Sequence, residues 1–188
     1  MSRAYRIRIA DSVRRHVTIE DGVCTSLDVL PLLGEEAMEE LLRDELLRRG
    51  FAKREDGFFE REQEGVTLRV DAITRQVSVI AKRDATFEAE HDAEVRSVIA
   101  NEGERARVEG ERVREALERT IEGGVARTRR ELSAVAADVL EAKREELDAI
   151  STAVTRAALE KKASQLGEIR SIEEDASTGS LTIRVRVG

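Results

Sequence analysis

The residues best able to carry metal or nucleophilic chemistry in this sequence of 188 residues are one cysteine, Cys24, and two histidines, His16 and His91. These three residues cannot complete a zinc site that requires four cysteine or histidine ligands. Cys24 has no histidine close to it in the sequence, and a single cysteine cannot form an intramolecular disulfide. His91 and its acidic neighbour Asp92 would point about 100° apart on a helix. We therefore predict exposed histidines, no catalytic residue and no metal site.

Carboxylate pairs are frequent in the sequence and predict surface ion pairs rather than acid–base catalysis. Glu39-Glu40, Glu145-Glu146 and Glu173-Glu174 flank arginine or lysine at helical or strand spacing. The sequence contains no glycine-rich nucleotide-binding loop and no His-Glu-x-x-His motif. We predict that the protein is not an enzyme and uses no cofactor, and we keep a small-molecule enzyme as a remote alternative.

A cluster of arginines is the strongest candidate for binding a partner. It surrounds Gly123-Gly124 and consists of Arg119, Arg127, Arg129 and Arg130. Guanidinium groups suit a phosphate or an acidic protein surface. Alternatively, these arginines pair with the neighbouring glutamates on a solvated face. No aromatic residue that could stack on a base lies close to the cluster, so we do not expect nucleic-acid binding.

The overall charge and composition exclude several classes of protein. The formal net charge is −7, from 32 basic and 39 acidic residues, and it opposes nonspecific binding to nucleic acid or anionic lipid. No segment approaches the roughly 18 apolar residues of a membrane span, and the N-terminus lacks the apolar core of a signal peptide. We predict a cytoplasmic protein in a reducing compartment.

The pattern of elements that must position these residues begins with a β-rich domain over 1–83. Apolar residues alternate with polar ones over 5–9 and 13–19, which predicts two strands joined by a turn at Asp11-Ser12. A helix is predicted over 35–49, because its leucines share one face and its terminal charges complement the helix dipole. Three further strands are predicted at 58–59, 66–70 and 77–81.

An internal repeat connects this domain to the C-terminal segment 167–188. Residues 71–79 and 175–183 share the pattern Asp-Ala-x-Thr-x-x-apolar-hydroxyl-branched, and each copy follows an apolar strand. This predicts two similar β-hairpins in which Asp and Thr bond the backbone of the turn. Such turns are also common without any duplication. We expect the C-terminal β-hairpin to join the N-terminal sheet, because an isolated hairpin is marginally stable.

A long charged α-helical arm is predicted over 84–166. Its apolar stripe recurs about every 3.7 residues, which indicates long packed helices without a regular leucine zipper. Gly123-Gly124 allows two topologies. A turn there would make an αα-hairpin, which we favour because two glycines inside a helix cost about 2 kcal/mol. A single continuous rod is the alternative, because the stripe passes through the glycines in phase.

Self-association is expected along this arm, because a two-helix arm with few aromatic residues buries too little surface to be rigid alone. The candidate contact residues lie on the apolar stripe: Leu132, Val139, Leu147, Ile150 and Val154. The predicted fold class is therefore α+β, with a small, mostly antiparallel sheet and one covering helix, a long helical arm of coiled-coil character and a C-terminal β-hairpin.

The whole chain also resembles a known group of bacterial accessory proteins. The segments that carry the resemblance are YRIRI, VTIEDGV, LDVLPLL, ELLRRGF and ALEKKASQLGEIRSIEEDASTGSLTIRVRV. The genes of this group lie in clusters with FtsH-like or MoxR-type AAA+ ATPases and von Willebrand factor A proteins, called a ternary system. The resemblance implies a non-catalytic adaptor or assembly subunit, and it carries over no site residue.

Two functions therefore follow. The first is a non-enzymatic, homo-oligomeric scaffold or assembly protein that uses its long helices for self-association. The alternative is an adaptor or accessory subunit that binds an AAA+ ATPase or another protein of the same gene cluster. In both, the partners are proteins, and neither nucleic acid nor a membrane span is expected.

Overall fold

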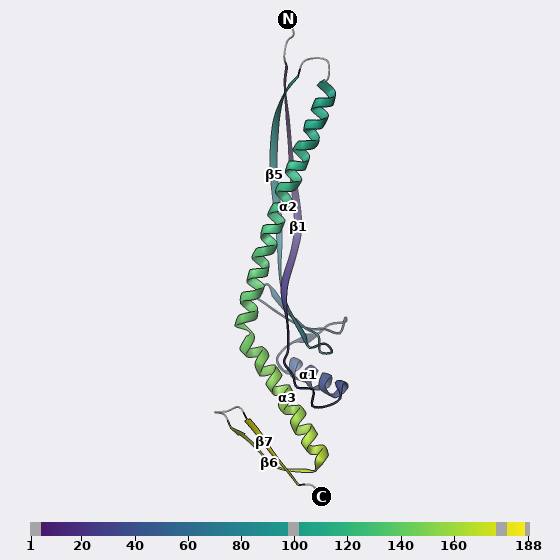
Figure 1. The fold of residues 1–188 in the computed structure, drawn as a ribbon, viewed down its shortest axis with the longest axis vertical. Helices are drawn as coiled ribbons and strands as arrows, with labels where there is room; N and C mark the ends of the chain where they lie inside the picture. The colour runs from purple at the N-terminus through teal and green to yellow at the C-terminus, as the bar shows by residue number, and fades with distance from the viewer. Residues whose placement is uncertain (1–4, 98–101, 176–179, 187–188) are drawn as a thin grey trace. The chain divides into compact units, whose positions relative to one another are not determined.

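A computed structural model describes residues 5–97, 102–175 and 180–186 (Figure 1). The chain is α+β, as predicted from the sequence, and the two long strands β1 and β5 are its most unusual elements. In chain order the elements are β1 (Tyr5–Ser26), α1 (Glu35–Arg48), β2 (Ala52–Lys53), β3 (Phe59–Gln63), β4 (Val66–Val70), β5 (Gln76–Ser97), α2 (Glu102–Ala142), α3 (Arg144–Leu166), β6 (Glu168–Asp175) and β7 (Ser180–Arg186).

The chain divides into two compact units. The first comprises Met1–Asp21 and Lys82–Ala134, and the second comprises Gly22–Ala81 and Val135–Gly188. These units do not coincide with the predicted consecutive segments 1–83, 84–166 and 167–188, because β1, β5 and α2 each contribute residues to both units. We describe each unit by itself.

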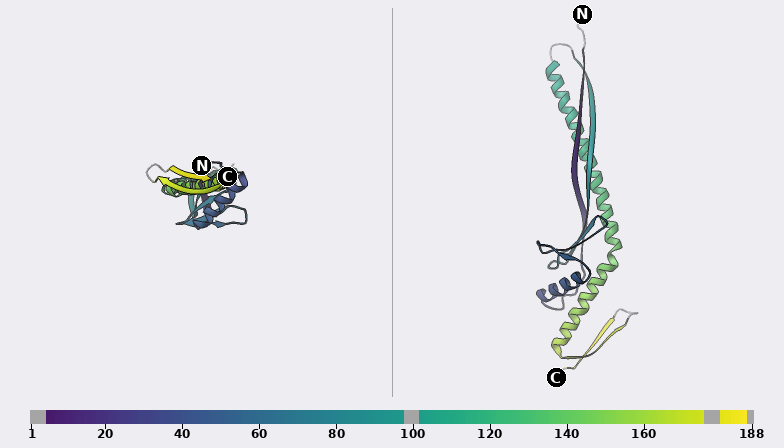
Figure 2. Two further views of the ribbon diagram at one scale, coloured as in Figure 1. Left: turned by 90° about the horizontal axis from the view of Figure 1, so that it is seen from below. Right: turned by 180° about the vertical axis from the view of Figure 1, so that it is seen from behind.

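The first unit is a two-stranded ribbon of β1 and β5 with α2 along one face (Figures 1 and 2). Its buried cluster consists of Ala89 from β5 and Val113, Leu117 and Ile121 from α2, each at most 7% exposed. Burial alternates along both strands, so one face packs on the helix and the other faces solvent. This thin layer between ribbon and helix is the core of the unit.

Two predictions about secondary structure in this unit are wrong. Asp11-Ser12 does not form a turn, because β1 is one strand from Tyr5 to Ser26. Residues 84–97, predicted to be helical, belong to β5. In both segments nearly all apolar residues have odd numbers, from Val13 to Ile19 and from Val77 to Val95, with Ile80 as the exception. That period of two is the pattern of a continuous strand.

The glycine pair does not form the favoured αα-hairpin, since α2 continues through Gly123 and Gly124. A Cβ added at Gly124 would lie 2.7 Å from Cδ1 of Phe87, whereas one at Gly123 would meet no atom within 4 Å. Gly124 therefore lets a ring from β5 lie directly on the helix backbone. The alternative of a single continuous helical rod is not realised over the whole arm either, because α2 ends at Ala142 and α3 begins at Arg144.

The second unit contains the deeper core. The five-stranded sheet has the order β1-β5-β4-β3-β2, and within this unit its buried face is made of cross-strand rows such as Phe59, Val70 and Val77. These three residues are at most 1% exposed. The helix predicted over 35–49 is confirmed as α1, and its Leu42 and Leu46 are fully buried.

The helix α3 packs against α1, and the β6–β7 hairpin contacts α3 (Figure 2). Ile150 and Val154 of α3 are at most 1% exposed. The C-terminal β-hairpin is confirmed, but its expected addition to the N-terminal sheet is wrong, because among the described residues β6 and β7 form their own two-stranded sheet. Contact with a helix replaces the support that we had expected from further strands.

The turn between β4 and β5 forms as the repeat predicted. The Asp71 carboxylate accepts hydrogen bonds from the backbone N–H of Ile73, at 2.9 Å, and from the hydroxyl of Thr74, at 2.7 Å. Burial raises the pKa of Asp71, but the hydrogen bonds from Thr74 and Ile73 outweigh it and hold the pKa below its usual value. In the second copy, residues 176–179 lie outside the described residues.

Candidate protein-binding surfaces

The residues that the sequence offered for chemistry lie apart on exposed strand faces. His16 Nδ1 lies 3.1 Å from the hydroxyl of Thr86, and the free thiol of Cys24 lies 3.3 Å from Oγ of Ser78. His91 is exposed on β5. Within residues 5–97, 102–175 and 180–186, no group of three or more His, Cys, Asp or Glu could hold a metal ion. No helix among these residues is long and apolar enough to cross a bilayer.

The four clustered arginines are exposed on α2 rather than at the tip of a hairpin. Two of them donate back to the carbonyls of their own helix: Arg119 Nε to Glu115, at 3.2 Å, and Arg130 Nε to Ala126, at 3.3 Å. Arg129 lines a shallow hollow of about 380 Å³ on the ribbon and α2. Arg127 is exposed on the same helix, and partner docking at this cluster stays a prediction.

The residues predicted for self-association are mostly covered within one chain. Leu132, Leu147, Ile150 and Val154 are at most 7% exposed, and Val139 is half-buried. These side chains form intrachain core, because α2 and α3 pack on strands and on α1 instead of leaving their stripe open. The four buried side chains offer little surface to a second copy, and self-association through this stripe stays a prediction.

The exposed face of the ribbon carries a regular series of cross-strand polar contacts, which we call the ladder. It pairs Arg6 with Glu94, Arg8 with Asp92, Arg14 with Glu88, His16 with Thr86, Thr18 with Asp84 and Glu20 with Lys82. The closest ion pair joins Arg8 Nη2 to Asp92 Oδ2 at 2.6 Å. Because these side chains are exposed, solvent screens the ion pairs and each contributes little to stability.

The ladder separates charge by strand. Residues 5–20 of β1 contain four arginines and two acidic residues, whereas residues 82–97 of β5 contain three basic and five acidic residues. The strands therefore carry +2 and −2, with histidines counted as neutral. In the last pair of the ladder the acidic residue, Glu20, lies on β1 and the basic residue, Lys82, lies on β5. The hydrogen bond and charge of Glu20 raise the pKa of Lys82. The ribbon thus has one basic and one acidic long side.

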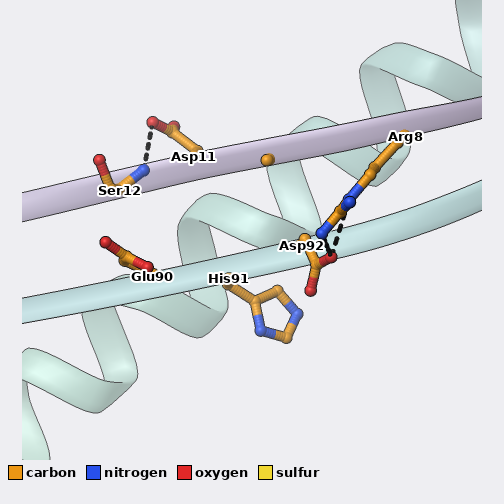
Figure 3. A pocket seen from close by; sticks show the side chains of 7 residues that line it. Arg8, Asp11, Ser12, Glu90, His91 and Asp92 are labelled. Carbon is orange, nitrogen blue, oxygen red and sulfur yellow. Dashed lines mark hydrogen bonds and ion pairs between the residues drawn. The ribbon is translucent and has the colours of Figure 1, made fainter.

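A hollow of about 600 Å³ lies on the ribbon between the two strands (Figure 3). Figure 3 shows Arg8 reaching across to Asp92, while the Asp11 carboxylate turns back to its own strand. There Asp11 Oδ1 accepts the backbone N–H of Ser12 at 2.8 Å. Four of its lining residues are engaged in these two contacts, Arg8 with Asp92 and Asp11 with Ser12, and we assign the hollow no ligand.

The second unit carries a more apolar hollow of about 420 Å³ beside α3, which we call the α3 groove. Its lining comes from three parts of the unit: Asp28 and Leu30 before α1, Ser151, Thr152, Thr155, Arg156 and Leu159 on α3, and Leu181 on β7. Leu30 is 56% exposed, and it lines the same hollow as Leu159 and Leu181. Apolar side chains with a few hydroxyls suit a protein side chain from a partner.

A second hollow of about 700 Å³ shares Thr152 and Arg156 with the groove and lies between α1 and α3. Its floor includes Ala149, Ala153 and Ala157, which are spaced one helical turn apart. No motif or periodicity in the sequence marks Leu30, Leu159 or the alanines. A usable signal was the apolar run around Pro31, which is too short for a helix and is not alternating.

An ion pair supports α3 beneath these surfaces. Arg61 of β3 donates from both terminal nitrogens to the Glu146 carboxylate, at 2.6 and 2.8 Å, and stacks over Phe51 at 4.6 Å from the ring centroid. The hydrogen bonds from Arg61 outweigh burial and hold the pKa of Glu146 below its usual value, and Lys143 adds to this effect. The start of α3 is thus tied to the sheet by a bidentate contact.

Comparisons with known proteins give one result for this chain. The family model described as FtsH ternary system domain X5 matches residues 1–187. Neither the curated proteins nor the solved structures gave a match.

Proposed function

Because the chain belongs to the FtsH ternary system domain X5 family, we propose that it is a non-enzymatic adaptor, an accessory subunit that binds a protein of an AAA+ ATPase system through the α3 groove. The family supports the accessory role, since it matches nearly the whole chain. The observation that supports the choice of surface is the exposed Leu30, which lines one hollow together with Leu159 and Leu181. The proposed occupant is an apolar side chain on a segment of the ATPase.

The chemistry of the α3 groove fits such a segment. Leu30, Leu159 and Leu181 offer apolar contact, and the hydroxyls of Thr152 and Thr155 can bond a partner's backbone. Asp28 and Arg156 add one charge of each sign at the lining. Apolar contacts with polar groups around them are the usual composition of a protein interface.

A binding experiment with a matched control tests this proposal. Leu30→Glu places a charge where the partner's apolar side chain would lie, and we expect at least about a tenfold loss of affinity for the AAA+ ATPase, measured by calorimetry. Ile73→Glu is the control, because Ile73 is 73% exposed in the same unit but does not line the groove. It should bind as the wild type does.

Both variants should keep the wild-type melting temperature, because both side chains are exposed. Equal affinity of Leu30→Glu and the wild type would place the contact elsewhere. Failure of the wild-type chain to bind any protein of the system would overturn the adaptor function itself.

A further inference from the structure

The ribbon of the first unit has two long edges without a neighbouring strand among the described residues. At the end of the sheet order, β1 has β5 as its single strand neighbour. The strand β5 pairs with β4 over Val77 to Ala81, so from residue 82 onward β1 is its strand neighbour. Each free edge presents unpaired backbone N–H and C=O groups, which favour addition of another strand.

The charges of the two edges determine which strand can be added. Pairing β1 with β1 of a second copy would oppose arginine-rich strands, and pairing β5 with β5 would oppose acidic ones. Pairing β1 of one copy with β5 of the next repeats the contacts of the ladder. Each of Arg8 and Arg14 would then lie between an acidic residue of its own β5 and one of the neighbouring copy.

The helix layer is compatible with the same arrangement. Two strands occupy about 9.6 Å, since neighbouring strands lie about 4.8 Å apart. Packed helices lie 8–10 Å apart. One α2 helix for each two-stranded ribbon therefore fills the layer above a continuous sheet without a gap or a clash.

We propose that the chain assembles head to tail, with the basic β1 edge of one copy pairing as a strand with the acidic β5 edge, residues 82–97, of the next. This contact is heterologous, so the copies form a closed ring or an open filament rather than a two-fold dimer. It uses neither the buried α2 and α3 stripe nor the α3 groove. The proposal goes beyond the adaptor function and can fail without it.

A charge-swapped chain tests the pairing. The variant Arg8→Asp, Arg14→Glu, Glu88→Arg, Asp92→Arg keeps opposite charges within its own ladder but exchanges the charges of the two edges. We expect the wild type and the swapped chain each to form oligomers larger than dimers by light scattering after size-exclusion chromatography. Mixed and separately tagged, they should not co-purify, because every mixed contact would oppose like charges.

Two half-swapped chains test the same contact by a second route, and circular dichroism checks that each keeps the wild-type fold, because like charges then face each other within its own ladder. Arg8→Asp with Arg14→Glu makes both edges acidic, and Glu88→Arg with Asp92→Arg makes both basic. Each half-swapped chain should be monomeric alone, and their mixture should assemble. The wild-type assembly should dissociate in about 1 M salt, where the Debye length is about 3 Å.

Several outcomes would overturn the proposal. They are a wild-type monomer at all concentrations, a wild-type dimer that does not grow further, mixed oligomers of wild-type and swapped chains, or half-swapped chains that assemble alone as the wild type does.

Discussion

The strand β5 is held in two different ways along its length. In the second unit Val77, Val79 and Ala81 are at most 1% exposed. In the first unit Phe87 and Ala93 of the same strand are only partly buried, and the opposite face carries the ladder. Burial contributes roughly 25 cal/mol per Å² of apolar surface, whereas an exposed ion pair contributes about 0.2–1 kcal/mol. The first unit thus keeps regular structure with a much smaller apolar core.

Core truncation should give the largest difference between the two units. Phe59→Ala removes a side chain that is 1% exposed at the centre of the second unit, and we expect a loss of about 3–5 kcal/mol in the free energy of unfolding. Leu117→Ala in the first unit should cost less, about 2–3 kcal/mol, because its thin layer can close around the cavity.

Denaturant unfolding combined with segment-resolved hydrogen exchange measures both effects. In Phe59→Ala the rate of amide hydrogen exchange should rise first in β3 and β4. In Leu117→Ala it should rise first in α2 and in residues 82–97. Equal losses for the two variants would contradict the difference in core depth between the units.

The glycine pair of α2 offers a smaller and sharper comparison within the first unit. Gly124→Ala forces a methyl group against the Phe87 ring, and we expect a net loss of about 1–3 kcal/mol from overpacking. Gly123→Ala meets no atom within 4 Å and should stabilise the helix by up to about 1 kcal/mol. Thermal unfolding of both variants measures the difference, and an equal gain in both would mean that the Phe87 ring can move aside.

A smaller effect is expected from the Arg61–Glu146 ion pair of the second unit. Because the folded chain holds the pKa of Glu146 below its ordinary value of 4.5, the pair stabilises the fold above that value. This contribution is lost as the pH falls through the folded-state pKa. Glu146→Gln should cost about 1 kcal/mol at neutral pH and should flatten the dependence of stability on pH below 4.5.

The matched control for this variant is Glu145→Gln, since Glu145 is exposed on the same turn of α3. The free energy of unfolding of both variants, measured in denaturant at pH 7 and at decreasing pH, distinguishes their effects. The same pH dependence in Glu146→Gln and the wild type would show that Arg61 does not hold the Glu146 carboxylate charged.

The parts of the fold that could be predicted are those with a local signal. Glu35, Arg48 and the leucines between them predicted α1 within one residue, and the short strands of the second unit carry both alternation and turns. The wrong assignment of residues 84–97 to a helix has a physical cause. Residues 84–97 are so charged that their period of two was taken for a solvated helix, although every apolar residue in the segment has an odd number.

The candidate surfaces were less accessible to sequence reasoning, because they depend on which segments meet. Pairing of Arg8 with Asp92 joins residues 84 positions apart, and no local pattern fixes such a register. Leu30 and Leu181 meet at the α3 groove only because the β6–β7 hairpin contacts α3. Likewise, the stripe on α2 and α3 was recognised, but its burial within one chain could not be seen before the strands were placed.

The nested pairing of β1 with β5 also allows the cross-strand pairs to form in a stepwise order during folding. Sequence separations rise from 54 residues for Cys24 and Ser78, through 66 for Thr18 and Asp84, to 84 for Arg8 and Asp92. Closing the longest of these loops instead of the shortest costs only about 0.4 kcal/mol more in chain entropy. Once the Asp71–Thr74 turn has aligned β4 and β5, β1 can therefore pair with β5 sequentially, from Cys24 towards the N-terminus. The pairs that form last are then the first to open.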